Sequence, residues 1–237
     1  MRIIVAPDPV LRQKCSSVTP EELPKLTKKA KQMAKLMYKS EGCGLAAPQV
    51  GIAKRLIVID TNTPKEGEKF EPNPTFLVNP VLSRLSDEKD TCSEGCLSIP
   101  GISIDIERAT ELELDALDLD GNEVHIEASG FAARALQHEL DHLDGITMFE
   151  HLDPISRIEK LQEFEQAKAA GAKPGDTGTT SNAGDTGTTK SSSAAGVAAP
   201  STSAAAPSDS TAGMVVPSGT CTTNTSPQIT AHGKDSS

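Results

Sequence analysis

Two histidines that stand four residues apart are the part of the sequence best suited to chemistry. His138 and His142 lie in a stretch with helical apolar spacing, so we expect both imidazoles on one helix face, within reach of a single metal ion. Glu139 would project about 100° around that helix from His138, beside the ion but not bound to it. This arrangement indicates metal-assisted hydrolysis, in which the cation lowers the pKa of water and a carboxylate accepts the proton.

A third ligand is needed, because catalytic sites of this kind use three protein ligands and leave one position open. Three downstream residues offer ligand atoms, but none has a suitable spacing: Asp144, Glu150 and His151. Upstream, Cys96 follows a glycine that permits close backbone approach, in the segment Glu94-Gly95-Cys96-Leu97-Ser98. We therefore expect Cys96 to complete the set.

Three segments together resemble the signature motifs of the peptide deformylase family. They are Gly42-Cys43-Gly44-Leu45-Ala46-Ala47-Pro48-Gln49, Glu94-Gly95-Cys96-Leu97-Ser98 and Gln137-His138-Glu139-Leu140-Asp141-His142, and they occur in the order of the family. The similarity extends from Arg2 to about Phe164. It implies a metal-dependent hydrolase that removes the formyl group from the N-terminal formyl-methionine of newly made proteins and releases formate.

The resemblance also implies residue roles. The metal ligands would be Cys96, His138 and His142, and Glu139 would be the general acid/base. The ion would be one Fe²⁺ per chain, with Zn²⁺ or Ni²⁺ as alternatives, because two imidazoles and a thiolate do not choose among these metals.

The substrate is expected to meet donors and an apolar pocket. The resemblance implies that Gln49 and the backbone N–H of Leu97 hydrogen-bond the formyl oxygen, and attack on a carbonyl does require such preorganised donors. Gly44, which has no side chain, would let the formyl end lie close to its loop. The residues expected around the methionine side chain are Cys43, Phe131 and Ala135.

Helices at both ends of the catalytic region should flank the strands. Thr19-Pro20-Glu21-Glu22 predicts a helix start, and apolar spacing carries that helix to about Ser40. A second helix is expected over residues 131–143, and a last one begins at Asp153-Pro154. The buried face of this last helix is predicted to contain Ile155, Ile158 and Leu161.

Residues between the first two helices alternate between apolar and polar types. Segment 42–51 has too many Gly and Pro residues for a helix interior and is expected to be a loop. Strands are predicted at residues 56–60, 75–79, 102–107, around 112–114 and at 124–128, with a hairpin turn at 120–122. The fold class is therefore α+β, with mostly antiparallel strands around a central metal-binding helix, N-terminal and C-terminal helices and a disordered C-terminal tail.

The composition changes near residue 170. Residues 1–168 are expected to form the catalytic domain, whereas residues 169–237 are a low-complexity tail of mainly Ala, Ser, Thr, Gly and Pro. Such a segment buries too little apolar surface to offset the entropy of ordering it, so we expect disorder. A solubilising appendage, a tether for the ribosome or another partner, and an unselected extension all remain open for the tail.

Charge and hydrophobicity limit the partners. A net charge of -10 argues against direct nucleic-acid binding, which depends on Lys and Arg. No apolar run is long enough for a membrane span and no cleavable leader is visible, so we expect a cytoplasmic protein. Its partners would be N-formyl-methionyl nascent polypeptides, and transient contact with the ribosome is compatible with that activity.

Three alternatives to deformylation remain at this stage. A zinc endopeptidase could use the same helical motif and would not need Cys96. A non-enzymatic binding module would use a closed four-ligand site and would tolerate loss of Glu139. The same fold could also act on a different formyl or acyl substrate.

Overall fold

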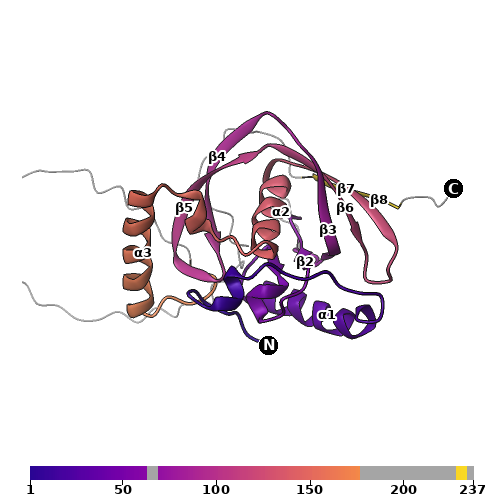
Figure 1. Cartoon of the computed structure of the whole chain (residues 1–237), viewed down its shortest axis with the longest axis horizontal. Coiled ribbons are helices and arrows are strands. Elements are labelled where there is room, and N and C mark those ends of the chain that lie inside the picture. Colours follow the sequence, from indigo (N-terminus) through magenta and orange to yellow (C-terminus); the bar gives the residue numbers. More distant parts are fainter. Residues whose placement is uncertain (63–68, 177–227, 234–237) are drawn as a thin grey trace, which may run out of the picture.

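Two antiparallel sheets surround a central helix in the computed structural model, which describes residues 1–62, 69–176 and 228–233 (Figure 1). The strands are β1 (Gly44–Ala46), β2 (Leu56–Ile59), β3 (Thr75–Leu85), β4 (Lys89–Cys96), β5 (Ile99–Ala109), β6 (Glu111–Leu117), β7 (Glu123–Ser129) and β8 (Gln228–Gly233). The helices are α1 (Leu23–Lys39), α2 (Gly130–Leu143) and α3 (Pro154–Ala169), with short 3-10 helices η1 (Pro9–Arg12), η2 (Ala47–Val50) and η3 (Met148–His151).

The larger sheet has the strand order β1-β2-β3-β6-β7-β8, and β4 and β5 form a separate hairpin. The alternation predicted for residues 102–107, 112–114 and 124–128 is present in β5, β6 and β7, whereas β2 is buried along its whole length. In β6, Leu112 and Leu114 are buried and lie opposite Ala128 and Ile126 of β7. Because successive strand residues point to opposite faces, this register directs one apolar row of each strand inward.

Helix α2 lies between the larger sheet and the hairpin (Figure 1). One of its faces packs against the larger sheet through the buried residues Ala132, Ala133, Leu136 and Leu143. The α+β architecture with antiparallel strands around this helix is the predicted one. The helix that carries both histidines is thus held from two sides.

The first helix begins later than predicted. Thr19 does not act as its N-cap, because residues 20–22 form a turn and α1 starts at Leu23. The Thr19 backbone N–H still donates to the Glu22 carboxylate at 2.9 Å, which is half of the reciprocal pattern that the sequence indicated. The expected apolar face is buried and contains Leu26, Ala30, Met33, Ala34 and Met37.

The prediction of a loop over residues 42–51 is wrong for most of that segment. Gly44–Ala46 forms β1, which pairs with β2 so that Gly44 lies opposite Ile59, and η2 follows directly. Glycine and proline exclude a helix interior, but they do not exclude a three-residue strand at the edge of a sheet or a proline in the first turn of a 3-10 helix.

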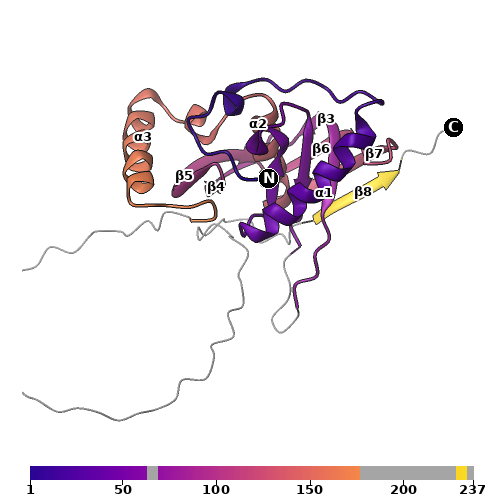
Figure 2. The same ribbon diagram turned by 90° about the horizontal axis from the view of Figure 1, so that it is seen from below.

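The predicted buried face of the last helix is also wrong. Ile155 and Ile158 are 72% and 58% exposed, whereas Phe164 is 1% exposed and packs into the core beside β5. Residues three apart shift by about 60° around a helix, so Ile155 and Phe164 lie on opposite sides. Leu161 is partly buried on the inner side, and Figure 2 shows α3 against the outer face of β5.

Two pieces of the expected tail belong to the described residues. Residues 170–176 turn back from the end of α3, and the backbone N–H of Gly101 donates to the carbonyl of Asp176 at 2.8 Å. Farther along, β8 pairs with β7, and Ile229 packs against the core. The edge of β7 offers unpaired backbone groups, which gives even a low-complexity segment a partner. Residues 177–227 and 234–237 lie outside the described part, and so does the prediction of disorder there.

Among the described residues, no helix combines the length and the apolar character that a membrane crossing requires.

Candidate metal centre

Three potential ligand atoms converge where the end of β4 meets α2. One atom from each of Cys96, His138 and His142 lies within 4.8 Å of the others. The Cys96 Sγ is 3.3 Å from the His142 Nε2, and the two imidazole rings are 5.0 Å apart between centroids. The structure therefore brings together the three residues that the sequence pointed to, although they are up to 46 positions apart.

In the metal-free site, Cys96 favours the thiolate and His138 the protonated imidazole, whose proton a bound cation would displace. Burial raises the pKa of the Cys96 thiol, but the adjacent His142 and His138 outweigh it and bring the pKa down to about 5. Burial works against the charged form of His138, yet Cys96 and Glu94 hold its pKa well above the usual value. A thiolate beside two imidazoles is a donor set typical of Zn²⁺, Fe²⁺ or Ni²⁺, so the residues present fit a metal ion.

Glu94 orients His138. The His138 Nδ1 donates to the Glu94 Oε2 at 2.9 Å, which leaves the opposite ring nitrogen for the site. Arg108 donates to both oxygens of Glu94 at 2.9 and 3.0 Å, and Arg134 adds a contact of 2.7 Å. Sequence reasoning did not assign this role to Glu94. General chemistry could have pointed to such a residue, because a histidine that binds a metal through one ring nitrogen needs an acceptor for the N–H of the other.

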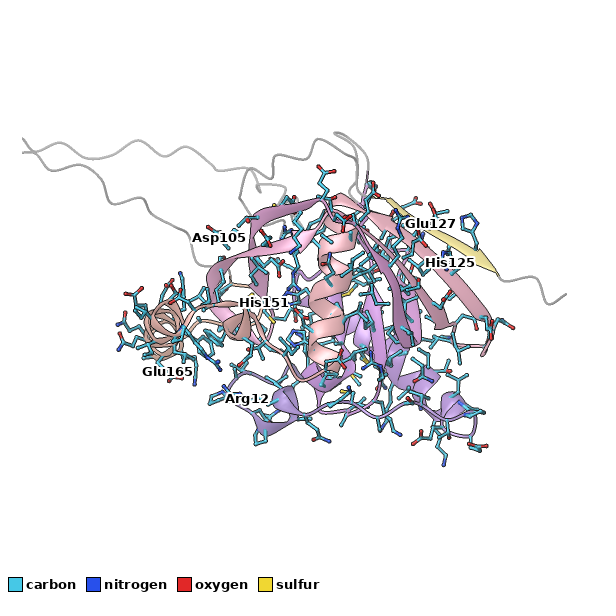
Figure 3. The ribbon with its side chains drawn as sticks, turned by 45° about the horizontal axis from the view of Figure 1, so that its top comes forward. Arg12, Asp105, His125, Glu127, His151 and Glu165 are labelled. Atoms are coloured by element: carbon cyan, nitrogen blue, oxygen red, sulfur yellow. The ribbon has the colours of Figure 1, made fainter. Side chains whose placement is uncertain are left out.

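The charged network continues to the surface on the side of η3. Arg108 also donates to the Asp141 Oδ2 at 2.6 Å, and the same oxygen is 2.7 Å from the His151 Nε2. Figure 3 shows His151 beside the central helix. His151, which had an unsuitable spacing as a ligand, is instead linked to the site through Asp141, Arg108 and Glu94. These contacts hold the hairpin and α2 in one arrangement.

Glu139 lies beside the three ligand atoms and is only 5% exposed. Burial raises the pKa of its carboxyl group to about 7, against the opposing influence of His138 and His142. Its Oε2 has no hydrogen-bond partner within the described residues. A carboxyl group with a pKa near neutrality can both accept and donate a proton under physiological conditions.

Gly44 provides space for Glu139. A Cβ atom at Gly44 would overlap the Glu139 Oε1 and would lie 3.0 Å from its Cγ and Cδ. Close approach at this glycine was predicted for the substrate, and the structure shows it for the acidic side chain. The small residue in β1 therefore positions the carboxylate on α2.

Gln49 presents its amide nitrogen to the site. Its Oε1 accepts a hydrogen bond from the Ala46 backbone N–H at 2.8 Å, which fixes the orientation of the amide group. The Nε2 then lies 3.3 Å from the Ser98 Oγ and 3.6 Å from the Cys96 Sγ. Leu97 follows Cys96 at the turn between β4 and β5, so both predicted formyl-oxygen donors border the same place.

A cleft opens in front of these groups. The predicted site residues that line it are Cys43, Gly44, Gln49, Cys96, Leu97, Phe131, Ala135, His138 and Glu139. His142, at 1% exposure, lies behind this surface. Glu41, Gly175 and Asp176 also line the cleft, and the sequence analysis missed them. For Gly175 and Asp176 no signal was available, because they belong to the segment for which disorder was expected.

Residues 1–158 match the family model for polypeptide deformylase, which is about two thirds of the chain. The chain belongs to the peptide deformylase family. A peptide deformylase of Rhizobium meliloti is 39% identical over 172 residues, which cover 72% of this chain and 96% of that protein.

Solved deformylase structures resemble the fold as well. The peptide deformylase of Synechococcus elongatus in complex with actinonin has a TM-score of 0.62 and 37% identity, over 70% of this chain and 86% of that one. The class I type b peptide deformylase of Acinetobacter baumannii with bound Met-Ala-Ser has a TM-score of 0.59 and 34% identity, over 64% of this chain and 98% of that one.

Membership of the deformylase family decides among the alternatives that the sequence left open. The chain is a hydrolase that removes the N-formyl group from newly synthesised N-formyl-methionyl polypeptides and releases formate. The family is metal-dependent, and the cluster of Cys96, His138 and His142 supplies a matching donor set. An endopeptidase and a non-enzymatic module are no longer needed as explanations.

Proposed function

We propose that Cys96, His138 and His142 hold one Fe²⁺ per chain, with Zn²⁺ and Ni²⁺ as alternatives. The observation that carries this proposal is the convergence of the three donor atoms within 4.8 Å beside a buried glutamate. A cation bound there would polarise the formyl carbonyl and lower the pKa of water. Fe²⁺ is the choice that the family resemblance favours.

Glu139 is the proposed general acid/base. It accepts a proton from the attacking water as the water oxygen bonds to the formyl carbon. When the C–N bond breaks, Glu139 passes that proton to the departing amine, so formate and a free methionine N-terminus are formed. A carboxyl pKa of about 7 supports both transfers, because the group is partly in each protonation state at neutral pH.

Gln49 and Leu97 are the proposed donors to the formyl oxygen. The Gln49 amide nitrogen and the Leu97 backbone N–H border the cleft next to Cys96, where charge develops on that oxygen in the transition state. Loss of one such donor typically removes about 3 kcal/mol of transition-state stabilisation.

The methionine side chain is proposed to occupy the apolar part of the cleft, against Cys43, Phe131 and Ala135. Gly44 lines the same end of the cleft and is assigned to substrate binding, through the space that it leaves for Glu139. The Acinetobacter baumannii structure contains Met-Ala-Ser, and a tripeptide that begins with methionine is the product class expected here.

Residues 1–168 are proposed as the catalytic domain, and residues 169–237 as an appended low-complexity tail. Because the substrate is a newly made polypeptide, we place the reaction in the cytoplasm and include transient contact with the ribosome. Direct nucleic-acid binding is not proposed, since the net charge is -10.

One assay tests the residue roles. The protein is purified anaerobically, metal content is measured by elemental analysis, and formate release from formyl-Met-Ala-Ser is followed for the parent, Cys96→Ala and Glu139→Gln. We expect Cys96→Ala to lose the ion, and Glu139→Gln to keep the ion while turnover falls at least about 100-fold. Glu165→Gln, on the exposed side of α3, is the matched control and should behave as the parent.

The outcomes separate ligand and proton-transfer roles. Full metal content in Cys96→Ala would remove that residue from the ligand set, and parental turnover in Glu139→Gln would refute the proton-transfer role. Reconstitution with Fe²⁺, Zn²⁺ or Ni²⁺ tests the metal, and a Zn²⁺ form faster than the Fe²⁺ form would overturn the choice of iron.

A further inference from the structure

The segment after α3 forms part of the substrate cleft. Residues 171–176 leave the end of the helix through a turn in which the Asp176 backbone N–H donates to the Lys173 carbonyl at 2.9 Å. Gly175 and Asp176 then line the same cleft as Glu139 and Cys96. This segment lies beyond residues 1–158, the part that matches the family model.

Two close backbone contacts hold the segment across the mouth of the cleft. On one side, the Gly101 N–H donates to the Asp176 carbonyl at 2.8 Å. On the other side, a Cβ at Gly175 would lie 2.8 Å from the Ser40 carbonyl oxygen, so the chain packs directly on the end of α1. The segment therefore bridges β5 and α1.

The bridge brings two exposed acidic side chains to one rim. Glu41 directly follows Ser40, and both Glu41 and Asp176 line the cleft and are exposed. The Asp176 carboxylate accepts a hydrogen bond from the Lys173 backbone N–H at 2.6 Å, which fixes its position. Lys173 itself is exposed and does not line the cleft.

The other charged residues that line the cleft are engaged deeper inside. Arg134 pairs with Asp90 and Glu94, and Glu94 also contacts Arg108. The charge that a peptide meets at the mouth is thus negative. With the formyl group at Glu139, each further residue carries the peptide outward by about 3.5 Å, so the residues after methionine pass this rim.

We propose that Asp176 and Glu41 are specificity-determining residues, which favour nascent chains with a basic residue shortly after the methionine and disfavour acidic ones. Opposite charges attract and like charges repel across a rim that is partly screened by solvent, so each carboxylate should change relative rates by about threefold to fivefold. The inference rests on the deformylation activity, but not on the proposed proton-transfer role of Glu139.

The test compares formyl-Met-Ala-Lys, formyl-Met-Ala-Glu and the neutral formyl-Met-Ala-Ser with the full-length, metal-loaded enzyme. We expect the parent to show a ratio of kcat/KM for the Lys peptide over the Glu peptide of about tenfold. This ratio should fall by about threefold in Asp176→Asn and in Glu41→Gln, and approach one in the double variant. Asparagine at position 176 can still accept the hydrogen bond from Lys173, so the turn is kept.

Three further readouts make the result decisive. The change should lie in KM and not in kcat, because a rim charge acts on substrate binding. Raising the salt concentration from about 50 to about 500 mM should shrink the parental ratio, since the Debye length falls. Glu159→Gln, an exposed acid on α3 that does not line the cleft, should keep the ratio of the parent.

An unchanged ratio in the double variant, or an equal fall in the control, would overturn the proposal. Turnover of the Ser peptide by the parent separately reports whether deformylation itself takes place.

Discussion

The burial of Glu139 affects both its stability in the charged form and its pKa. Its carboxyl group is 5% exposed and one of its oxygens has no partner within the described residues, so the charged form is disfavoured. The same burial raises its pKa to about 7, which is the range that general acid/base catalysis at neutral pH requires. The burial that suits the proposed acid/base role of Glu139 should therefore also reduce stability.

The pH dependence of the unfolding free energy can show the effect of this burial. In the folded, metal-free protein the pKa of Glu139 is raised from 4.5 to about 7. Its stabilising contribution is therefore complete below pH 4.5 and lost as the pH rises through 7. We expect the unfolding free energy of the parent, relative to Glu139→Gln, to fall by on the order of 3 kcal/mol between pH 4.5 and about pH 8.

Denaturant unfolding in the presence of a chelator provides the measurement. Glu165→Gln is the control, because that side chain is 61% exposed and lies on α3, outside the cleft. A difference between parent and Glu139→Gln that stays constant over the same range would show that burial does not raise the pKa of this carboxyl group.

Phe164 is the fully buried side chain of helix α3, and Leu161 and Ala167 are partly buried beside it. Phe164 packs beside β5 and lies 5.9 Å from Phe149 between ring centroids, whereas Ile155 and Ile158 point to solvent. A single large aromatic side chain removes more apolar area from water than partial burial of the two isoleucines would. The position of α3 also determines where residues 171–176 begin.

Two substitutions on α3 should differ sharply in their effect. Phe164→Ala leaves a cavity in the core and should lower the unfolding free energy by about 3–5 kcal/mol. Ile158→Ala removes exposed surface and should change it by no more than about 0.5 kcal/mol. Urea unfolding of both variants measures the difference. Equal destabilisation would mean that the isoleucine face is buried after all.

At the scale of the whole molecule, the last strand of the larger sheet comes from the far end of the chain. β8 pairs with β7 from Val124 opposite Gly233 to Ser129 opposite Gln228. The described residues that line the cleft, in contrast, end at Asp176. The added strand and the lining of the cleft therefore belong to different parts of the region after α3.

Truncation after Asp176 should separate the two. We expect the shortened protein to keep kcat/KM for formyl-Met-Ala-Ser within about threefold, because every described cleft residue remains. It should also associate more readily in light scattering, since β7 then presents an uncovered edge. A fall in turnover of more than about tenfold would mean that residues after 176 contribute to the active site.

Local patterns in the sequence were sufficient for much of the fold and for the chemistry. Alternation in β5, β6 and β7 and helical spacing in α1 and α2 predicted those elements, because each pattern reflects which side of an element meets the core. The spacing of His138 and His142 placed both imidazoles on one face without any tertiary information. The motif segments added Cys96 and the expected donors to the formyl oxygen.

Contacts between distant residues could only come from the folded chain. The pairing of His138 with Glu94 joins residues 44 positions apart, and the approach of Gly175 to Ser40 joins residues from still more distant parts of the chain. No local spacing encodes such pairs, because their geometry depends on how sheets and helices pack. The same reason explains the error on α3: an apolar side chain marks a buried face only when the core lies on that side.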